Sequence, residues 1–206
     1  MPSGFGRAEI RYPSELLRNK NLISEREKME FAFLHWIQGL GSPVMDKIMT
    51  AITFLGNGGW FWIGVGLILF AVPKTRRIGA GVLISLVLGF IVGNVVLKNL
   101  IARQRPCWLD QTVALLVENP RDFSFPSGHS LASFEGAVSI FLYDKRWGGA
   151  AIVLAALIAF SRLYLFVHFP TDVLAGTILG ILVAFFVHRW LEHPDRPWNQ
   201  KEVEVK

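Results

Sequence analysis

The sequence has one cysteine, few charged residues and no apolar segment near its start. Because Cys107 is the only cysteine, an intrachain disulfide, a cysteine-rich zinc site and an iron–sulfur cluster are excluded, while the redox compartment stays open. Charged residues make up 18% of the chain and hydrophobic residues 52%, a balance that excludes an ordinary water-soluble globule. The mean hydropathy of +0.40 indicates an integral membrane protein.

The charge excess is small and dispersed. The 21 Lys and Arg residues exceed the 16 Asp and Glu residues by five, without a basic stripe, so nucleic acid is not an expected partner. Residues 1–28 mix basic and acidic side chains and hold no apolar core of the length that a signal peptide needs. We therefore expect no cleavable signal peptide, and insertion through the spans of the mature chain.

Five apolar stretches predict membrane-crossing helices. A bilayer core needs about 20 helical residues, and Ile78–Leu97 is an uncharged run of that length. Only helices or closed barrels satisfy backbone polar groups in lipid, so the sequence predicts an all-α integral membrane bundle. The other stretches are Trp60–Val72, which follows a break at Gly56–Gly59, Ser127–Tyr143, Trp147–Val167 and Pro170–Leu191.

The region ahead of these stretches has a different pattern. Apolar residues follow helical spacing on both sides of Gly39–Pro43, which favours two short amphipathic helices at the membrane interface. A broken sixth crossing is the alternative, so we expect five to six transmembrane helices. The expected organisation is a polar tail at 1–29, amphipathic helices at 30–58, a transmembrane core at 59–192 and a polar tail at 193–206.

Lys and Arg residues in the connections predict the orientation. With alternating helix directions, nine of them fall on one side, which the positive-inside rule makes cytoplasmic. Five others near the opposite side, and a basic N-terminal region, weaken this count. We expect a multi-pass plasma-membrane protein whose Cys107–Phe125 connection faces outward. The nine residues are Lys74, Arg76, Arg77, Lys145, Arg146, Arg189, Arg196, Lys201 and Lys206.

Polar residues that hydrocarbon tolerates poorly cluster at the end of the second predicted span, at the start of the third, and between the fourth and the fifth. If the helices alternate in direction, all three clusters lie at one face of the membrane. Three cations among them suit a multiply charged oxyanion such as phosphate. A helix starting at Ser127, with Gly128 allowing close backbone approach, suits the same ligand. The cations are Lys98, Arg105 and Arg162.

Two histidines and an aspartate add reactive groups. His168 and Asp172 lie four residues apart around the start of the last span, where the carboxylate can fix the imidazole tautomer and leave the other nitrogen as a nucleophile. His129 can protonate a leaving oxygen. Cations that bind an anion, a nucleophile and an acid are together the parts of a phosphoryl-transfer site.

Three motifs carry a specific family resemblance: Lys98-x6-Arg105-Pro106, Pro126-Ser127-Gly128-His129 and Ser161-Arg162-x5-His168-x3-Asp172. In this order and spacing they resemble the signature of the type 2 phosphatidic acid phosphatase family, which also includes vanadium haloperoxidases. Many bacterial members have six spans, whereas this chain shows five clear ones. The resemblance covers the region from about Trp60 to Leu191.

The resemblance implies a metal-independent phosphatase without a cofactor that works through a phosphohistidine. By this resemblance His168 attacks phosphorus, Asp172 orients His168, and His129 protonates the leaving group. The phosphoryl oxygens are held by Lys98, Arg105, Arg162 and the Ser127–Gly128 backbone. Each residue alone could have an ordinary structural role, such as a snorkelling lysine or a helix cap, but one phosphate site explains all of them together.

Several polar residues lie outside this pattern. We expect Arg103 and Arg121 to face lipid headgroups, and we assign no role to His35, His188 and His193. Glu135 lies inside a predicted span, where our hypothesis is a pairing with one of the arginines, and a protonated structural residue is the alternative.

The expected substrate is a lipid phosphate or diphosphate whose tail stays in the bilayer. On resemblance and outward topology, an isoprenyl diphosphate such as undecaprenyl diphosphate is favoured, followed by phosphatidylglycerol phosphate or phosphatidic acid. The competing interpretation is a membrane carrier or binder of anionic lipid headgroups without enzymatic activity.

Overall fold

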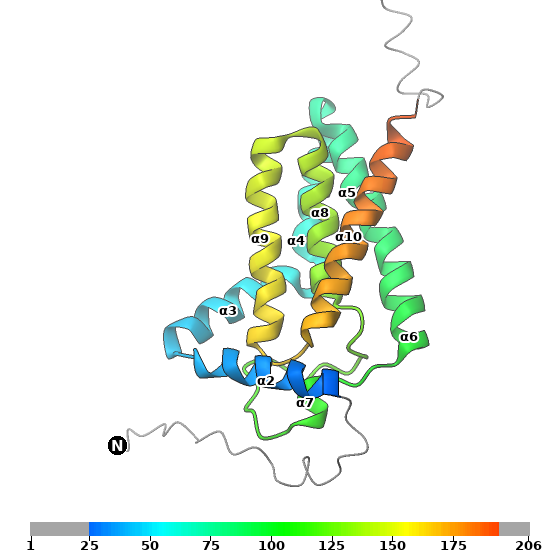
Figure 1. Cartoon of the computed structure of the whole chain (residues 1–206). Helices are drawn as coiled ribbons and strands as arrows, with labels where there is room; N and C mark the ends of the chain where they lie inside the picture. Colours follow the sequence, from blue (N-terminus) through cyan, green and yellow to red (C-terminus); the bar gives the residue numbers. More distant parts are fainter. Residues whose placement is uncertain (1–24, 194–206) are drawn as a thin grey trace, which may run out of the picture.

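A computed structural model describes residues 25–193, in which helices stand side by side and further helices lie across one end (Figure 1). Residues 1–24 and 194–206, which make up most of the tails expected at 1–29 and 193–206, lie outside the described residues. No strand occurs between residues 25 and 193. The upright helices are α4 (Trp60–Ala71), α5 (Arg76–Gly89), α8 (Gly128–Tyr143), α9 (Lys145–Tyr164) and α10 (Pro170–Leu191).

Helix α8 is the centre of the bundle. It packs against α5, α9 and α10, and its 16 residues span about 24 Å. Because its neighbours cover it, α8 can carry polar side chains: Trp62 Nε1 donates to Ser133 Oγ at 3.1 Å, and the hydroxyls of Ser85 and Ser139 lie 3.3 Å apart.

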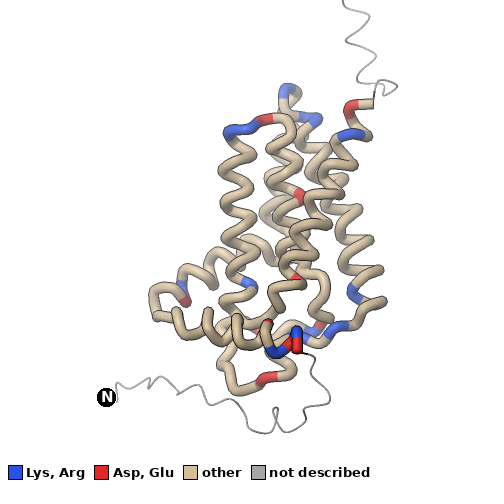
Figure 2. Tube along the Cα trace, viewed as in Figure 1, with Lys and Arg blue, Asp and Glu red and all other residues tan. Residues whose placement is uncertain are grey.

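Four helical runs within residues 25–193 are long and apolar enough to cross a membrane: Pro43–Ala71, Pro73–Leu109, Lys145–Tyr164 and Pro170–Leu191. Their arrangement around α8 confirms the predicted all-α membrane bundle. Figure 2 shows Lys, Arg, Asp and Glu mainly at the two ends of the bundle, with few along its length. A bundle with this charge distribution suits a bilayer.

The second predicted span is not one regular helix. After α5, the chain continues through the π-helical segment η3 (Phe90–Leu97) into the short helix α6 (Lys98–Ile101). Helix α6 is followed by its C-cap residue Ala102, which adopts a left-handed conformation with φ of 48°. This run places Lys98 at the end of the bundle where the other predicted site residues lie. A π segment often marks a functional region of a helix.

The helices α2 (Glu25–Gly39) and α3 (Pro43–Gly56) lie across the same end (Figure 1). Helix α2 buries Phe31, Leu34 and Ile37 against the connection between α9 and α10. It also exposes apolar side chains, which agrees with an interfacial position. The exposed side chains are Met29, Phe33, Trp36 and Leu40.

The expected break before α4 occurs in the short 3-10 segment η1 (Asn57–Gly59), where Gly58 and Gly59 have φ of 57° and 70°. Such left-handed values favour glycine. The break lets α3 lie obliquely while α4 stands in the bundle. Another 3-10 turn, η2 (Pro73–Thr75), joins α4 to α5, and the single-turn helix α7 (Pro106–Leu109) follows α6.

Side-chain caps determine where the long helices begin. Asp144 accepts hydrogen bonds from the backbone N–H groups of Arg146 and Trp147 at the start of α9. Helix α10 starts with Pro170, and Asp172 Oδ2 accepts from the Phe169 N–H at 2.9 Å. The side chain that caps α10 is therefore also a candidate catalytic residue.

Candidate active site

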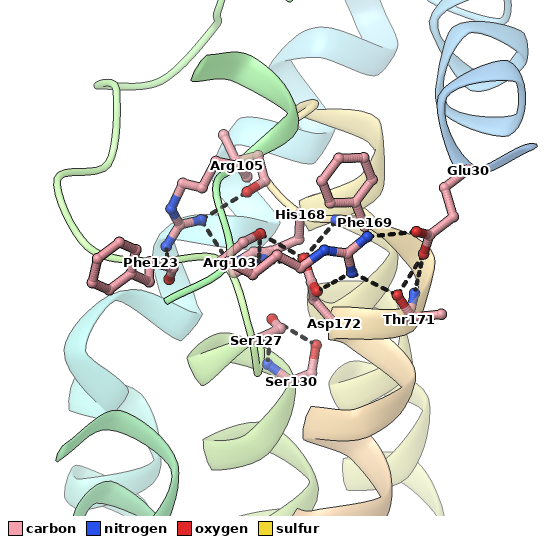
Figure 3. Close-up of polar contacts among 12 residues, drawn as sticks. Glu30, Arg103, Arg105, Phe123, Ser127, Ser130, His168, Phe169, Thr171 and Asp172 are labelled. Atoms are coloured by element: carbon pink, nitrogen blue, oxygen red, sulfur yellow. Dashed lines mark hydrogen bonds and ion pairs between the residues drawn. The ribbon is translucent and has the colours of Figure 1, made fainter. Parts of the chain in front are cut away.

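The structure brings the three predicted motifs together at the end of the bundle that carries α2 (Figures 1 and 3). The first motif comes from α6 and α7, the second starts α8, and the third covers the end of α9 and the start of α10. His168 lies in the connection between α9 and α10 and is 1% exposed.

The ring of His168 is held from both sides. On one side Arg105 Nη1 lies 3.0 Å from His168 Nε2. On the other side His168 Nδ1 lies 3.4 Å from Ser124 Oγ and 3.7 Å from Asp172 Oδ2. Because an arginine can only donate, Nε2 accepts, and the ring proton is assigned to Nδ1. This tautomer keeps a lone pair on Nε2, as a nucleophile requires.

Ser124 is part of the site although the sequence did not indicate it. Its hydroxyl donates to Asp172 Oδ2 at 2.5 Å, so serine and aspartate together face Nδ1 of His168. Burial, and then the positive charges of Arg105, Arg162 and Lys98, lower the pKa of His168 well below its usual 6.5. The imidazole is therefore neutral at physiological pH.

Three buried cations surround the site. Lys98, Arg105 and Arg162 are 7%, 2% and 5% exposed. Arg105 is fixed by the carbonyls of Val167 and Phe123, at 2.7 and 3.3 Å. Arg162 Nη1 donates to Thr53 Oγ1 at 2.6 Å, whereas its Nε has no hydrogen-bond partner in the described part of the chain.

Asp122 neutralises part of this positive charge. Its carboxylate binds Lys98 and lies 2.8 Å from Arg105 Nη2. Burial opposes ionisation of Asp122, but the hydrogen bond from Lys98 and the charge of Arg105 outweigh it and lower the pKa to about 2. The carboxylate thus occupies donors that were predicted to hold a phosphoryl group.

His129 is the second residue of α8, and its Nε2 lies 2.9 Å from Asn57 Oδ1. It lines a cavity of about 730 Å³ together with Lys98 and Asp122. The cavity extends between α4, α5, η3 and α8, where most of its lining is apolar. The apolar lining includes Ile63, Leu83, Leu86, Val87, Phe90 and Leu131.

Ser127 has a structural task. Its hydroxyl accepts from the N–H and the hydroxyl of Ser130, and its own N–H donates to the Asp172 carbonyl at 3.0 Å. The N–H of Ser127 is therefore engaged within the protein. A Cβ added to Gly128 would lie 2.9 Å from Asn94 Oδ1, and the role of the Gly128 backbone in binding a phosphoryl oxygen stays a prediction.

Two expectations need correction. Arg103 does not face headgroups: it turns inward and binds Asp172 and Glu30 (Figure 3). Glu135 does not pair with an arginine: its Oε1 has no hydrogen-bond partner among the described residues, and the side chain packs against Gly89 beside the cavity. His35, which was assigned no role, pairs with Asp110 at 3.0 Å.

The helical membrane bundle and this site define a membrane phosphatase. The model of the PAP2 superfamily matches residues 78–195, which contain all three motifs, so the chain belongs to the PAP2 superfamily. Phosphatases of this superfamily need no metal ion. Among residues 25–193, no group of three or more His, Cys, Asp or Glu side chains could hold one.

Known relatives agree with this membership. An undecaprenyl-diphosphatase from Sulfolobus acidocaldarius is 37% identical over 137 residues, which cover 65% of this chain and 66% of that enzyme. Phosphatidylglycerophosphatase B from Bacillus subtilis is 37% identical over 162 residues, which cover 70% of this chain and 74% of the relative.

Solved structures show the same architecture. A PAP2-type phosphatidylglycerolphosphate phosphatase from Bacillus subtilis matches with a TM-score of 0.70 and 29% identity, covering 90% of this chain and 98% of that one. LpxE from Aquifex aeolicus matches with a TM-score of 0.68 and 26% identity, and the match covers 76% of this chain and 93% of LpxE. The chain is therefore a membrane lipid phosphatase of the PAP2 superfamily.

Proposed function

We propose that this protein hydrolyses an isoprenyl diphosphate of the undecaprenyl type through a phosphohistidine, with phosphatidylglycerol phosphate and phosphatidic acid as the next candidates. The observation that carries the proposal is the neutral imidazole of His168, whose Nε2 lone pair lies among three buried cations. Relatives named as undecaprenyl-diphosphatases support the choice of substrate.

In the first step, Nε2 of His168 forms a bond to the terminal phosphorus as the bond from phosphorus to the bridging oxygen breaks. His129, which enters the step as an imidazolium, donates its proton to that oxygen and becomes neutral, and the isoprenyl monophosphate leaves. Asp172 and Ser124 stabilise the proton on Nδ1. Lys98, Arg105, Arg162 and the Gly128 backbone bind the phosphoryl oxygens and stabilise the charge of the transition state.

In the second step, His129 takes a proton from water, and the water oxygen attacks the phosphohistidine. The bond from phosphorus to Nε2 breaks, and inorganic phosphate is released. Asn57, 2.9 Å from His129 Nε2, keeps this ring directed toward the cavity through both steps.

The cavity and the charge distribution support a lipid substrate on the outer face of the plasma membrane. The apolar lining along α4, α5 and η3 suits a hydrocarbon tail that remains in the bilayer. The basic connections at Lys74–Arg77 and Lys145–Arg146 lie at the opposite end of the bundle from the site. By the positive-inside rule, that end is cytoplasmic and the site faces outward.

The decisive test is phosphate release by purified protein from a panel of lipid phosphates. We expect activity with undecaprenyl diphosphate to exceed that with phosphatidylglycerol phosphate and phosphatidic acid. His168→Ala should abolish release, His193→Ala should retain it, and EDTA should have little effect. Lipid binding without phosphate release by the wild type would instead support a headgroup carrier, and activity of folded His168→Ala would exclude His168 as the nucleophile.

A further inference from the structure

Arg103 and Glu30 form a partly buried ion pair between α2 and the catalytic loops (Figure 3). Arg103 Nη2 lies 2.5 Å from Glu30 Oε2, while Arg103 Nη1 donates to Asp172 Oδ1 at 2.6 Å and to Thr171 Oγ1 at 2.7 Å. The side chains of Arg103 and Glu30 are only 16% and 8% exposed. One guanidinium therefore joins a carboxylate of α2 to the carboxylate beside His168.

The two oxygens of Asp172 have separate partners. Oδ2 accepts from Ser124 and from the Phe169 N–H and faces Nδ1 of His168, whereas Oδ1 accepts from Arg103. Arg103 consequently fixes the rotation of the carboxylate together with the two donors to Oδ2. A change of that rotation would move Oδ2 relative to the imidazole.

Glu30 holds Arg103 and the start of α10 at once. Its Oε1 accepts from the N–H and the hydroxyl of Thr171, the residue that precedes Asp172. Arg103 also stacks over the ring of Phe169, with its Cζ 4.1 Å from the ring centroid. The guanidinium is thus confined between an aromatic face and two carboxylates.

We propose that Glu30 and Arg103 are positioning residues for phosphoryl transfer: helix α2, through this ion pair, sets the orientation of Asp172 and hence of His168. The inference rests on the proposed function, because it assigns the pair to the step in which His168 attacks phosphorus. Neither residue touches the substrate. A misplaced imidazole slows the attack without changing how the cations bind the phosphoryl group.

The test compares Glu30→Gln and Arg103→Lys with a matched control, Glu192→Gln, which removes a carboxylate that faces Arg77 at the opposite end of the bundle. We expect Glu30→Gln and Arg103→Lys to lower kcat by about tenfold to a hundredfold. KM should change less than about twofold, because ground-state binding is retained. Glu192→Gln should leave both unchanged.

Orthovanadate and inorganic phosphate separate positioning from a general structural defect. Vanadate forms a five-coordinate species with an attacking nucleophile, so its inhibition constant should rise by about the same factor as kcat falls. The inhibition constant of inorganic phosphate should stay within about twofold of the wild-type value. Equal weakening of both anions would contradict the positioning role.

A double variant tests whether the two residues act together. Glu30→Gln should have a smaller effect on kcat in an Arg103→Lys background than in the wild type, because both changes disturb the same carboxylate. If the wild type is active and Glu30→Gln has the same kcat and the same inhibition constant for vanadate, the inference is wrong. If the wild type releases no phosphate from any lipid, the proposed function fails instead.

Discussion

Two of the three buried cations of the active site share the carboxylate of Asp122, and we expect this balance to affect how the site binds its ligand. Lys98 and Arg105 both bind Asp122, whose side chain is about half exposed. If these cations bind the phosphoryl group as proposed, that group has to displace the carboxylate. We therefore expect Asp122 to compete with the substrate for the two cations and also to stabilise them as their counter-ion.

Asp122→Asn should strengthen inhibition by inorganic phosphate by about threefold to tenfold, since the amide competes less well for the cations. It should also lower the melting temperature in detergent, because Lys98 and Arg105 lose their counter-ion. With a pKa lowered from 3.8 to about 2, Asp122 contributes stability above pH 3.8 that is lost as pH falls toward 2. Glu118→Gln, an exposed change in the same loop, is the control; equal phosphate inhibition in both variants would contradict the competitor role.

His168 predicts a pH dependence of stability. The folded protein keeps this imidazole neutral, whereas the unfolded chain binds a proton below its ordinary pKa of 6.5. The unfolded state then binds more protons, so stability falls as pH drops below 6.5, by up to about 1.4 kcal/mol per pH unit. Melting curves between pH 7 and 5 should show a shallower decline for His168→Gln than for the wild type, and parallel curves would count against this assignment.

Residues with motif spacing were predictable, and their supporting partners were not. His168 and Asp172 lie four residues apart, so their pairing could be expected from helix geometry. Ser124, Asn57 and Glu30 reach the site from segments far away in the chain, and each alone resembles an ordinary loop or surface residue. Long-range packing brings them together, and no local pattern in a single sequence indicates it.

Close helix crossings hold the elements around the site. At the crossing of α8 and α10, a Cβ added to Gly176 would lie 2.5 Å from the Ser127 carbonyl oxygen, and one added to Gly180 would lie 2.6 Å from that of Leu131. Small residues let the two backbones approach, as is usual for membrane helices. The second and third motifs keep their relative positions through this contact.

Gly176→Ala should therefore lower stability by about 1–3 kcal/mol, because the backbone of α8 has to move away from the new methyl group. The matched control is Gly64→Ala in α4, where an added Cβ meets nothing within 4 Å. Thermal unfolding in detergent measures both. A Gly176→Ala protein as stable as Gly64→Ala would mean that the crossing adapts without cost.

Helices were more predictable than their irregularities. Hydropathy is a local property, so the lengths of α9 and α10 followed from apolar runs. The π-helical segment η3 lies within an uncharged run that is apolar except for Asn94, and hydropathy alone does not indicate a change of helical period there. The interfacial position of α2 remains a prediction, supported by its exposed apolar side chains.

For the whole molecule, the orientation can be tested with single cysteines, because Cys107→Ser removes the only native thiol. In that background, Glu118→Cys marks the loop near the site and Lys145→Cys marks the opposite end of the bundle. A membrane-impermeant maleimide should label Glu118→Cys in intact spheroplasts, and Lys145→Cys only after permeabilisation. Both variants should retain phosphatase activity, and the reverse labelling pattern would place the site in the cytoplasm.

The shortness of α8 has a consequence for kinetics. Its 16 residues extend about 24 Å, less than the roughly 30 Å of a hydrocarbon core, so we expect His129 in its first turn to lie near the level where headgroups meet chains. We therefore expect a lipid to enter the cavity sideways without leaving its leaflet. Turnover should then show surface dilution. Adding inert detergent or lipid at a constant bulk substrate concentration should lower the rate, because the rate depends on the mole fraction of substrate within the membrane plane.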